Sequence, residues 1–188
     1  NLPEKLFDNL LSLQTINLAD NRLLIDVKDE LKNLKNIRNV NLSNTDLRNL
    51  SLNHNSIFGL YMRNLSVEIL YSINFSNLIN LRDLDLSYNS KLDLNFWTRF
   101  PMRTIRNLQK LTLTNINLTS NDNIDFLNGT VSLKEIDLSN NFLRFNGSFL
   151  RQSRAIEIIK LANCNLRNVS KDYFNFENYF YLQFLDFS

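Results

Sequence analysis

Apolar residues recur along the chain in the template L-x-x-L-x-L-x-x-N-x-L, in which the x positions are mostly polar. The central part alternates apolar and polar positions, which predicts a short strand with the apolar side chains inward and the others outward. Copies start at residues 13, 37, 57, 81, 108, 133, 156 and 182, and the end of the sequence interrupts the last one. The chain is therefore predicted to repeat one strand-and-return unit about seven to eight times.

The register between residues 37 and 67 is ambiguous. The segment 47–57 also fits the template, but it starts only ten residues after Ile37. A coil of this kind needs roughly 20–29 residues to close. We therefore place the third copy at Ile57.

A second spacing precedes most strands: apolar residues three apart, as in Phe7-x-x-Leu10-x-x-Leu13. This spacing suits a short 3-10 or helical turn on the far side of each coil. Aromatic residues begin three of these segments, and we expect them to stack as a spine: Phe7, Phe75 and Phe176.

The template asparagine lies where the chain leaves the strand, and a buried amide there can hydrogen-bond backbone groups of neighbouring coils. Thr45 and Cys164 can make weaker versions of this bond, whereas Leu65 and Ile116 cannot, so we expect the ladder to be interrupted there. The chain has 32 Asn against 3 Gly and 2 Pro. Asparagine is therefore expected to supply the turns, because it tolerates left-handed backbone conformations.

The repeat resembles that of the leucine-rich-repeat family over essentially the whole chain. The resemblance implies an α/β class fold: a horseshoe solenoid with one short parallel strand per repeat on the concave face and 3-10 or helical turns and loops on the convex face. Steps near 24 residues are similar to those of the typical animal extracellular class, and segment 2–10 resembles part of a Toll or Toll-like receptor ectodomain. Both ends stop inside the pattern without cysteine-rich caps, so residues 1–188 are expected to be an uncapped piece of a longer array.

Charge and hydropathy indicate neither a polyanionic partner nor a membrane-spanning segment. The chain carries 21 basic and 19 acidic residues, a net charge of +2. This balance does not indicate nucleic acid or an anionic membrane surface. No apolar run approaches the roughly 18 residues of a membrane span.

Residues for catalysis or metal binding do not occur in sets. Cys164 and His54 are the single residues of their types, so no zinc site or Cys–His nucleophile is expected within the chain. Asp83 and Asp85 alternate along an open strand and do not form a desolvated acid–base pair. We therefore expect no enzyme activity, no cofactor and no metal.

Two features disagree about the compartment. A lone cysteine is typical of intracellular proteins, whereas N-x-S/T acceptors for N-glycosylation occur eight times. Together with the family resemblance, the acceptors favour an extracellular or cell-surface location. Asn41 is the least favourable acceptor because it lies within a predicted strand. The candidate N-glycosylation sites are Asn49, Asn64, Asn74, Asn117, Asn128, Asn146 and Asn168.

The outward strand side chains form a ladder with about 4.8 Å between coils. Charged members would set the association rate and selectivity, whereas the apolar Tyr61, Ile158 and Phe184 would anchor a ligand. The candidate ligand-binding residues are Tyr61, Arg63, Asp83, Asp85, Lys110, Glu135, Asp137, Ile158, Lys160 and Phe184.

These features predict a macromolecule-binding segment of a cell-surface receptor ectodomain, and the resemblance implies Toll-like signalling in innate immunity or development. The expected partner is a protein or another macromolecule, and the solenoid offers surface for a homo- or heterodimer. Two alternatives stay open: a leucine-rich-repeat adhesion or structural surface protein, and an intracellular repeat scaffold.

Overall fold

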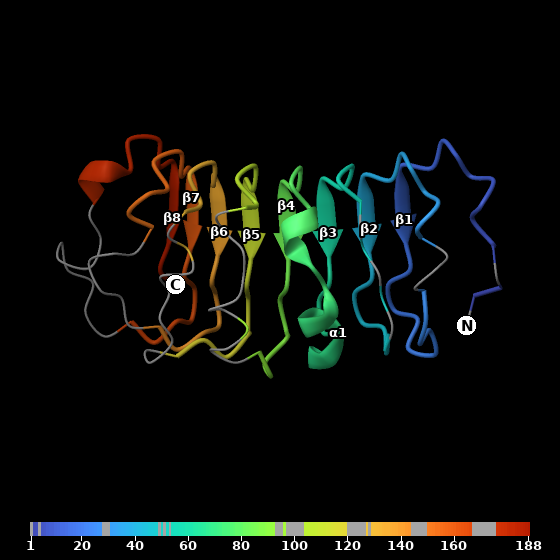
Figure 1. Cartoon of the computed structure of the whole chain (residues 1–188). Coiled ribbons are helices and arrows are strands. Elements are labelled where there is room, and N and C mark those ends of the chain that lie inside the picture. The colour runs from blue at the N-terminus through green and yellow to red at the C-terminus, as the bar shows by residue number, and fades with distance from the viewer. Residues whose placement is uncertain are drawn as a thin grey trace.

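The computed structural model describes residues 2–3, 5–27, 31–48, 50, 52, 54–92, 96, 104–119, 127, 129–143, 150–166 and 176–188. Within these residues, eight three-residue strands form one parallel sheet in chain order (Figure 1). The strands are β1 (Thr15–Asn17), β2 (Asn39–Asn41), β3 (Gly59–Tyr61), β4 (Asp83–Asp85), β5 (Lys110–Thr112), β6 (Glu135–Asp137), β7 (Ile158–Lys160) and β8 (Phe184–Asp186). The short helices are α1 (Val67–Ser72), η1 (Phe75–Asn77) and η3 (Phe176–Asn178).

Each strand pairs in register with the next, so equivalent template positions lie side by side in space. Ile16 is opposite Val40, Val40 opposite Leu60, and Leu60 opposite Leu84. The third coil thus has the register that begins at Ile57. The predicted fold class, an α/β solenoid with one parallel strand per repeat, is confirmed.

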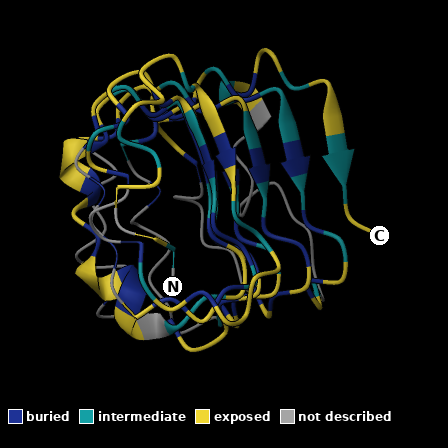
Figure 2. Ribbon diagram, turned by 90° about the vertical axis from the view of Figure 1, so that its right-hand side faces the viewer, coloured by how far each residue is buried: buried dark blue, intermediate teal, exposed yellow. Residues whose placement is uncertain are grey.

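The core lies inside the coils, between the sheet and the return segments. The central residue of each strand from β1 to β7 is buried, while most of the flanking strand residues are at least partly exposed. Figure 2 shows the strands on one side of the solenoid and the helical turns and loops on the other. Full burial of a leucine or isoleucine side chain contributes about 1.5–3 kcal/mol, so stacking the coils supplies the main stabilising term.

The predicted aromatic spine is wrong. Phe7 and Phe75 precede β1 and β4, which are three coils apart, and a separation of about 14 Å is beyond ring contact. Phe75 instead packs edge-to-face on Phe96, with ring centroids 6.3 Å apart, and Tyr71 packs on the same ring at 5.5 Å. The side chain of Phe176 lies outside the described residues. These two aromatic contacts join residues of adjacent return segments rather than equivalent template positions.

Two template asparagines, Asn89 and Asn141, join neighbouring coils through buried amides. Asn89 donates to the carbonyl of Met62 in the preceding coil at 2.8 Å and to that of Leu86 in its own coil at 2.7 Å. Its oxygen accepts from the backbone N–H of Leu65 at 2.8 Å. Leu65 occupies the template position of the preceding coil, where the side chain has no polar group. The ladder of side-chain hydrogen bonds is therefore interrupted at Leu65, as expected. The backbone N–H of Leu65 nevertheless has a hydrogen-bond partner, which is the side chain of Asn89 in the next coil.

A left-handed residue directly precedes each template position. Seven residues, each five positions after the start of its strand, have φ between 49° and 63°: Asp20, Asn44, Asn64, Tyr88, Asn115, Asn140 and Asn163. Five of them are asparagines, which agrees with the expectation that asparagine supplies the turns. Several form a second side-chain ladder, in which Asn44 donates to Asp20 at 2.8 Å and Asn64 donates to Asn44 at 3.1 Å.

Replacing Tyr88 by asparagine is expected to raise the free energy of unfolding by about 1 kcal/mol, because a bulky residue is costly in the left-handed region and asparagine is not. Tyr88 has φ of 63° and interrupts the second ladder. Urea unfolding of the two proteins measures the difference. The reciprocal change Asn140→Tyr should destabilise by a similar amount, because it also removes the acceptor of the 2.9 Å bond from Asn163. A Tyr88→Asn variant no more stable than the parent would show that no strain is stored at this turn.

Candidate ligand-binding face

The outward side chains of β1–β8 form one open surface, which we call the strand face. Nine of the ten predicted ligand-binding residues are outward or edge residues of β3–β8, and Arg63 follows β3 by two positions. The alternation of the short strands places them there, since inward positions are taken by leucine and isoleucine. The strand face therefore carries nearly all of the predicted ligand-binding residues.

A half-buried polar pair lies near the middle of the strand face. The hydroxyl of Tyr61 donates to Oδ2 of Asp83 at 2.8 Å. The tyrosine crosses the sheet above Gly59, where a Cβ atom would lie 2.5 Å from Oδ1 of Asn39 and 3.2 Å from the tyrosine oxygen. A glycine at this position thus gives Tyr61 room to reach the next strand.

Burial changes the titration of this pair. Burial, supported by the bond to Asp83, raises the pKa of Tyr61 to about 12. Burial also raises the pKa of Asp83, outweighing the hydrogen bond from Tyr61 and the charge of Lys110, both of which lower it. Oδ1 of Asp83 is buried and has no hydrogen-bond partner among the described residues. A buried carboxylate oxygen without a hydrogen-bond partner costs free energy.

A second polar cluster covers the next three strands. Oε1 of Glu135 on β6 is 2.7 Å from Nζ of Lys160 on β7, and Oε2 is 3.2 Å from Nζ of Lys110 on β5. Burial raises the pKa of Glu135, but the bonds from the two lysines outweigh it and hold the pKa below its usual value of 4.5. The same hydrogen bond raises the pKa of Lys160, because it stabilises the charged form of the lysine as well. The carboxylate is thus fixed as an anion between two cations.

This cluster gives stability that depends on pH. Because the pKa of folded Glu135 is lowered, its contribution is present above pH 4.5 and is lost as the pH falls through the folded pKa. A Glu135→Gln variant should therefore be less stable than the parent at pH 7, by up to about 1 kcal/mol. The difference should shrink as the pH falls from 5 to 3. Thermal unfolding at a series of pH values tests this, and a difference that does not change with pH would contradict it.

Two of the acidic residues that were predicted to bind a ligand, Asp85 and Asp137, have a structural role. Oδ1 of Asp85 accepts from the backbone N–H of Ser87 at 2.9 Å, and Oδ1 of Asp137 accepts from that of Ser139 at 3.0 Å. The same turn recurs at the equivalent asparagine Asn41, whose Oδ1 accepts at 3.1 Å. One oxygen of each carboxylate is therefore committed to closing the turn after the strand. The recurrence of Asn or Asp at this template position was the sequence signal for that role.

Arg63 lies at the edge of the strand face. Its Nε is 3.6 Å from Oδ2 of Asp85, and its guanidinium carbon lies 5.1 Å from the centroid of the Tyr88 ring. The side chain is nevertheless 47% exposed, so it keeps donors available to a partner.

The three predicted apolar anchors do not form one patch. Ile158 and Phe184 are direct neighbours across β7 and β8, and Phe184 is 48% exposed. Tyr61 lies four strands before Ile158 in the sheet order. A single small ligand could not use all three, whereas an extended protein surface could.

The described glycosylation candidates are all exposed: Asn64, Asn74 and Asn117. Asn74 begins η1, where its Oδ1 accepts from the backbone N–H of Ser76 at 3.1 Å. Asn64 is committed through its amide to Asn44. The remaining candidates lie outside the described residues: Asn49, Asn128, Asn146 and Asn168.

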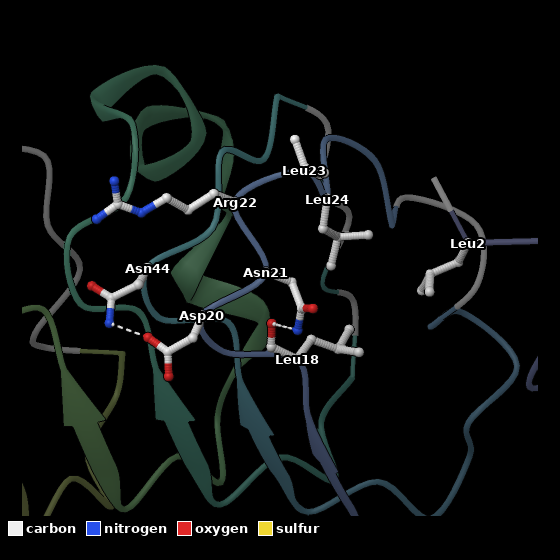
Figure 3. Close-up of a pocket in the computed structure, with 8 residues that line it drawn as sticks. All are labelled: Leu2, Leu18, Asp20, Asn21, Arg22, Leu23, Leu24 and Asn44. Atoms are coloured by element: carbon white, nitrogen blue, oxygen red, sulfur yellow. Dashed lines mark hydrogen bonds between the residues drawn. The ribbon is translucent and has the colours of Figure 1, made fainter.

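A cavity of about 720 Å³ opens at the N-terminal end of the solenoid (Figure 3). It is lined by Leu2, Leu18, Asp20, Asn21, Arg22, Leu23, Leu24 and Asn44. None of the predicted ligand-binding residues contributes to it. Its apolar lining is the end of the core, so it is a different surface from the strand face.

Other chemistry is limited in the part of the chain that the structure describes. No group of three or more His, Cys, Asp or Glu side chains there could hold a metal ion. Cys164 is buried, burial raises the pKa of its thiol, and the thiol donates to the carbonyl of Leu138 at 3.2 Å. Among the same residues, no helix has the length and apolar character needed to cross a membrane.

Sequence reasoning missed a group on the flank of the strand face, in the residues directly before the strands. The ring of Phe58 lies between the guanidinium groups of Arg38 and Arg82. These residues are 20 and 24 positions apart in the sequence, and only the register of the coils brings them together. No local motif could have indicated the group.

No protein-family profile matches the chain, and no curated protein matches its sequence. Several solved structures match its fold. Internalin C2 from Listeria monocytogenes superposes with a TM-score of 0.66 at 18% identity, over 93% of this chain and 74% of that one. Human 5T4, also named trophoblast glycoprotein, gives 0.61 at 23% identity, over 81% of this chain and 61% of that one.

The Toll–Spatzle complex of Drosophila also matches, with a TM-score of 0.54 at 19% identity. That match covers 97% of this chain and 30% of the matched chain, so this chain spans less than a third of it. The Toll–Spatzle complex is described as a hub in development and innate immunity. Identities this low establish a shared solenoid architecture and nothing more specific.

Proposed function

We propose that this chain, which has the leucine-rich-repeat fold, is a protein-binding segment of a cell-surface or secreted receptor. The observation that carries the proposal is the ordered polar network on the strand face. It consists of the Tyr61–Asp83 pair and the Lys110–Glu135–Lys160 cluster, which together extend over β3–β7.

The network suits protein recognition because its side chains are already held in place. Ordering charged and aromatic side chains before binding reduces the entropy that association would otherwise cost. Tyrosine is enriched among the interface residues that contribute most of the binding energy. Neighbouring strands are about 4.8 Å apart, so a network over five strands is long enough to contact an extended protein surface.

The receptor assignment is the finer part of the proposal. It is supported by the resemblance of segment 2–10 to Toll-type repeats and by the fold shared with the Toll–Spatzle complex. Signalling would follow from ligand-driven pairing of ectodomains. The acidic and basic residues of the strand face would select the ligand through charge complementarity.

Intact mass of the natively produced protein, before and after enzymatic removal of N-glycans, tests the location. We expect a loss of several glycan masses, with Asn74 among the occupied sites, because Asn74 is exposed and its amide nitrogen makes no hydrogen bond to another described residue. An Asn74→Gln variant should lose one glycan. No mass change would contradict the extracellular assignment and favour the intracellular scaffold.

Binding to an array of secreted and cell-surface proteins from the source organism tests the protein-binding role. At least one partner should bind, and a Tyr61→Ala, Lys160→Ala double variant should weaken it by about tenfold or more. The control is Gln14→Ala, which changes an exposed residue before β1, outside the network. A partner that binds the double variant and the parent equally well would show that the strand face is not the contact surface.

A further inference from the structure

Phe58, the residue directly before β3, lies between two arginines from the neighbouring coils. The guanidinium carbon of Arg38 is 5.5 Å from the ring centroid, and that of Arg82 is 4.8 Å from it. The backbone holds the three residues in line, because Phe58 N–H donates to the carbonyl of Arg38 at 2.7 Å and Arg82 N–H donates to that of Phe58 at 2.8 Å. Both distances to the ring lie within the range of a cation–π contact.

The two guanidinium groups lack an acidic partner. Both arginines are exposed, and neither side chain forms an ion pair or hydrogen bond with another described residue. The same row of residues before the strands offers a contrast, since Lys134 is paired with Glu157 at 2.8 Å. Arg38 and Arg82 therefore carry charge that the described part of the solenoid leaves uncompensated.

Stacking prepares these groups for an anion. A guanidinium that stacks on a ring does so through its flat face, which leaves its N–H donors, all in the plane of the group, available to an anion. Holding a long side chain against a ring also removes part of the rotamer freedom that binding would otherwise cost. The donor fork of a guanidinium matches a carboxylate in two parallel hydrogen bonds.

We propose that Arg38, Phe58 and Arg82 form a binding site for two carboxylates of an acidic protein segment. The inference rests on the proposed function for its class of partner, and it adds the chemistry that the partner must carry. The arginines belong to coils two steps apart, about 10 Å. Two acidic residues separated by one or two others in an extended peptide, at about 3.3 Å per residue, reach across that distance.

The surroundings favour a short acidic segment over a polyanion. The row continues on either side with neutral residues, Gln14 before β1 and Gln109 before β5. A sulfated polysaccharide or a nucleic acid needs an extended basic stripe to compete with its counterions. With Gln14 and Gln109 next to the two arginines, the row of residues before the strands does not form such a stripe there.

The test uses the full chain and the peptide acetyl-Glu-Gly-Glu-amide, with acetyl-Gln-Gly-Gln-amide as the uncharged control. Titrations are followed by the NMR signals of the arginine Nε–H groups in isotope-labelled protein. The acidic peptide should shift the signals of Arg38 and Arg82, and the amide peptide should not. Arg38→Gln and Arg82→Gln should each weaken binding by about two- to fivefold, as expected for exposed ion pairs.

Lys134→Gln is the matched control, because it removes a cation of the same row that Glu157 already neutralises. It should leave binding of the acidic peptide unchanged. Phe58→Leu keeps an apolar side chain but removes the stack, and it should weaken binding while both charges remain. Circular dichroism confirms that each variant is folded.

Three results would overturn the inference: no shift at either arginine, equal binding of the two peptides, or equal weakening by Lys134→Gln. Inorganic phosphate and a heparin-derived oligosaccharide serve as competing probes. If either bound more tightly than the acidic peptide and lost affinity in the arginine variants, the carboxylate assignment would be wrong. The protein-array experiment tests the proposed function independently, so the failure of either idea is distinguishable from the failure of the other.

Discussion

Replacing Asn141 by leucine is expected to lower the free energy of unfolding by about 3–5 kcal/mol, because several buried backbone groups lose their partners at once. The amide nitrogen of Asn141 donates to the carbonyls of Leu113 and Leu138, both at 2.8 Å. Its oxygen accepts from the backbone N–H groups of Ile116 and Leu118, both at 3.1 Å. Asn141 is only 1% exposed, so water cannot replace these bonds.

Asn21 provides a matched control at the same template position. Its amide donates to the carbonyls of Leu18 and Ala19, both in its own coil, at 2.9 and 3.0 Å. Asn21 is exposed, so water can take over these bonds, and Asn21→Leu should cost about 1 kcal/mol or less. Urea unfolding monitored by circular dichroism measures both variants. Equal losses at the two positions would show that the amide's bonds to the neighbouring coil contribute little.

Leu47→Ala is expected to destabilise the protein by about 2–5 kcal/mol, because it removes apolar atoms and leaves a cavity in a packed core. Leu47 is fully buried, at 0% exposure, at the last apolar position of its template copy. The same unfolding experiment measures the loss. A smaller truncation at this site, Leu47→Val, should produce an intermediate value if cavity formation is the cause.

Leu23 occupies the equivalent template position in the first copy but is 91% exposed. Leu23→Ala should therefore change the free energy of unfolding by no more than about 0.5 kcal/mol. In the first copy, the side chain that is buried in the core is that of the next residue, Leu24, which is 6% exposed. A large loss from Leu23→Ala would mean that this leucine is covered in solution by a surface that the described residues do not include.

The strand positions followed from sequence because they depend on local alternation. Leucine or isoleucine at every second position can face the core only if the chain is extended there, and the steps between copies then set the register. Asparagine as the turn residue was predicted on the same local basis and agrees with the left-handed residues at Asn44, Asn64 and Asn140.

The choice between neighbouring residues was not predictable. The template treats Leu23 as a core position, but the packing of the first coil buries Leu24. The aromatic spine failed for a related reason, since equivalent residues three coils apart cannot touch and Phe75 contacts Phe96 instead. Both outcomes depend on the path of the return segments, whose lengths differ from coil to coil.

For the candidate site, too, one part was predictable from sequence and another was not. The sequence placed Tyr61, Asp83, Glu135 and Lys160 on one open face, because outward strand positions are a matter of period-two alternation. The pairing among them depends on the reach of side chains across strands. Tyr61 reaches Asp83 only because Gly59 leaves space beneath it, and this follows from no pattern along the chain.

By itself, then, the sequence determined the repeat, the short parallel strands, the asparagine turns and the side chains that face outward. These properties are local, because each depends on the chemistry of residues within one coil. Only the tertiary structure decided which charges are neutralised and that Arg38 and Arg82 meet on Phe58. The ion pairs and the Arg38–Phe58–Arg82 group join residues 20 or more positions apart, and their geometry is set by how successive coils stack.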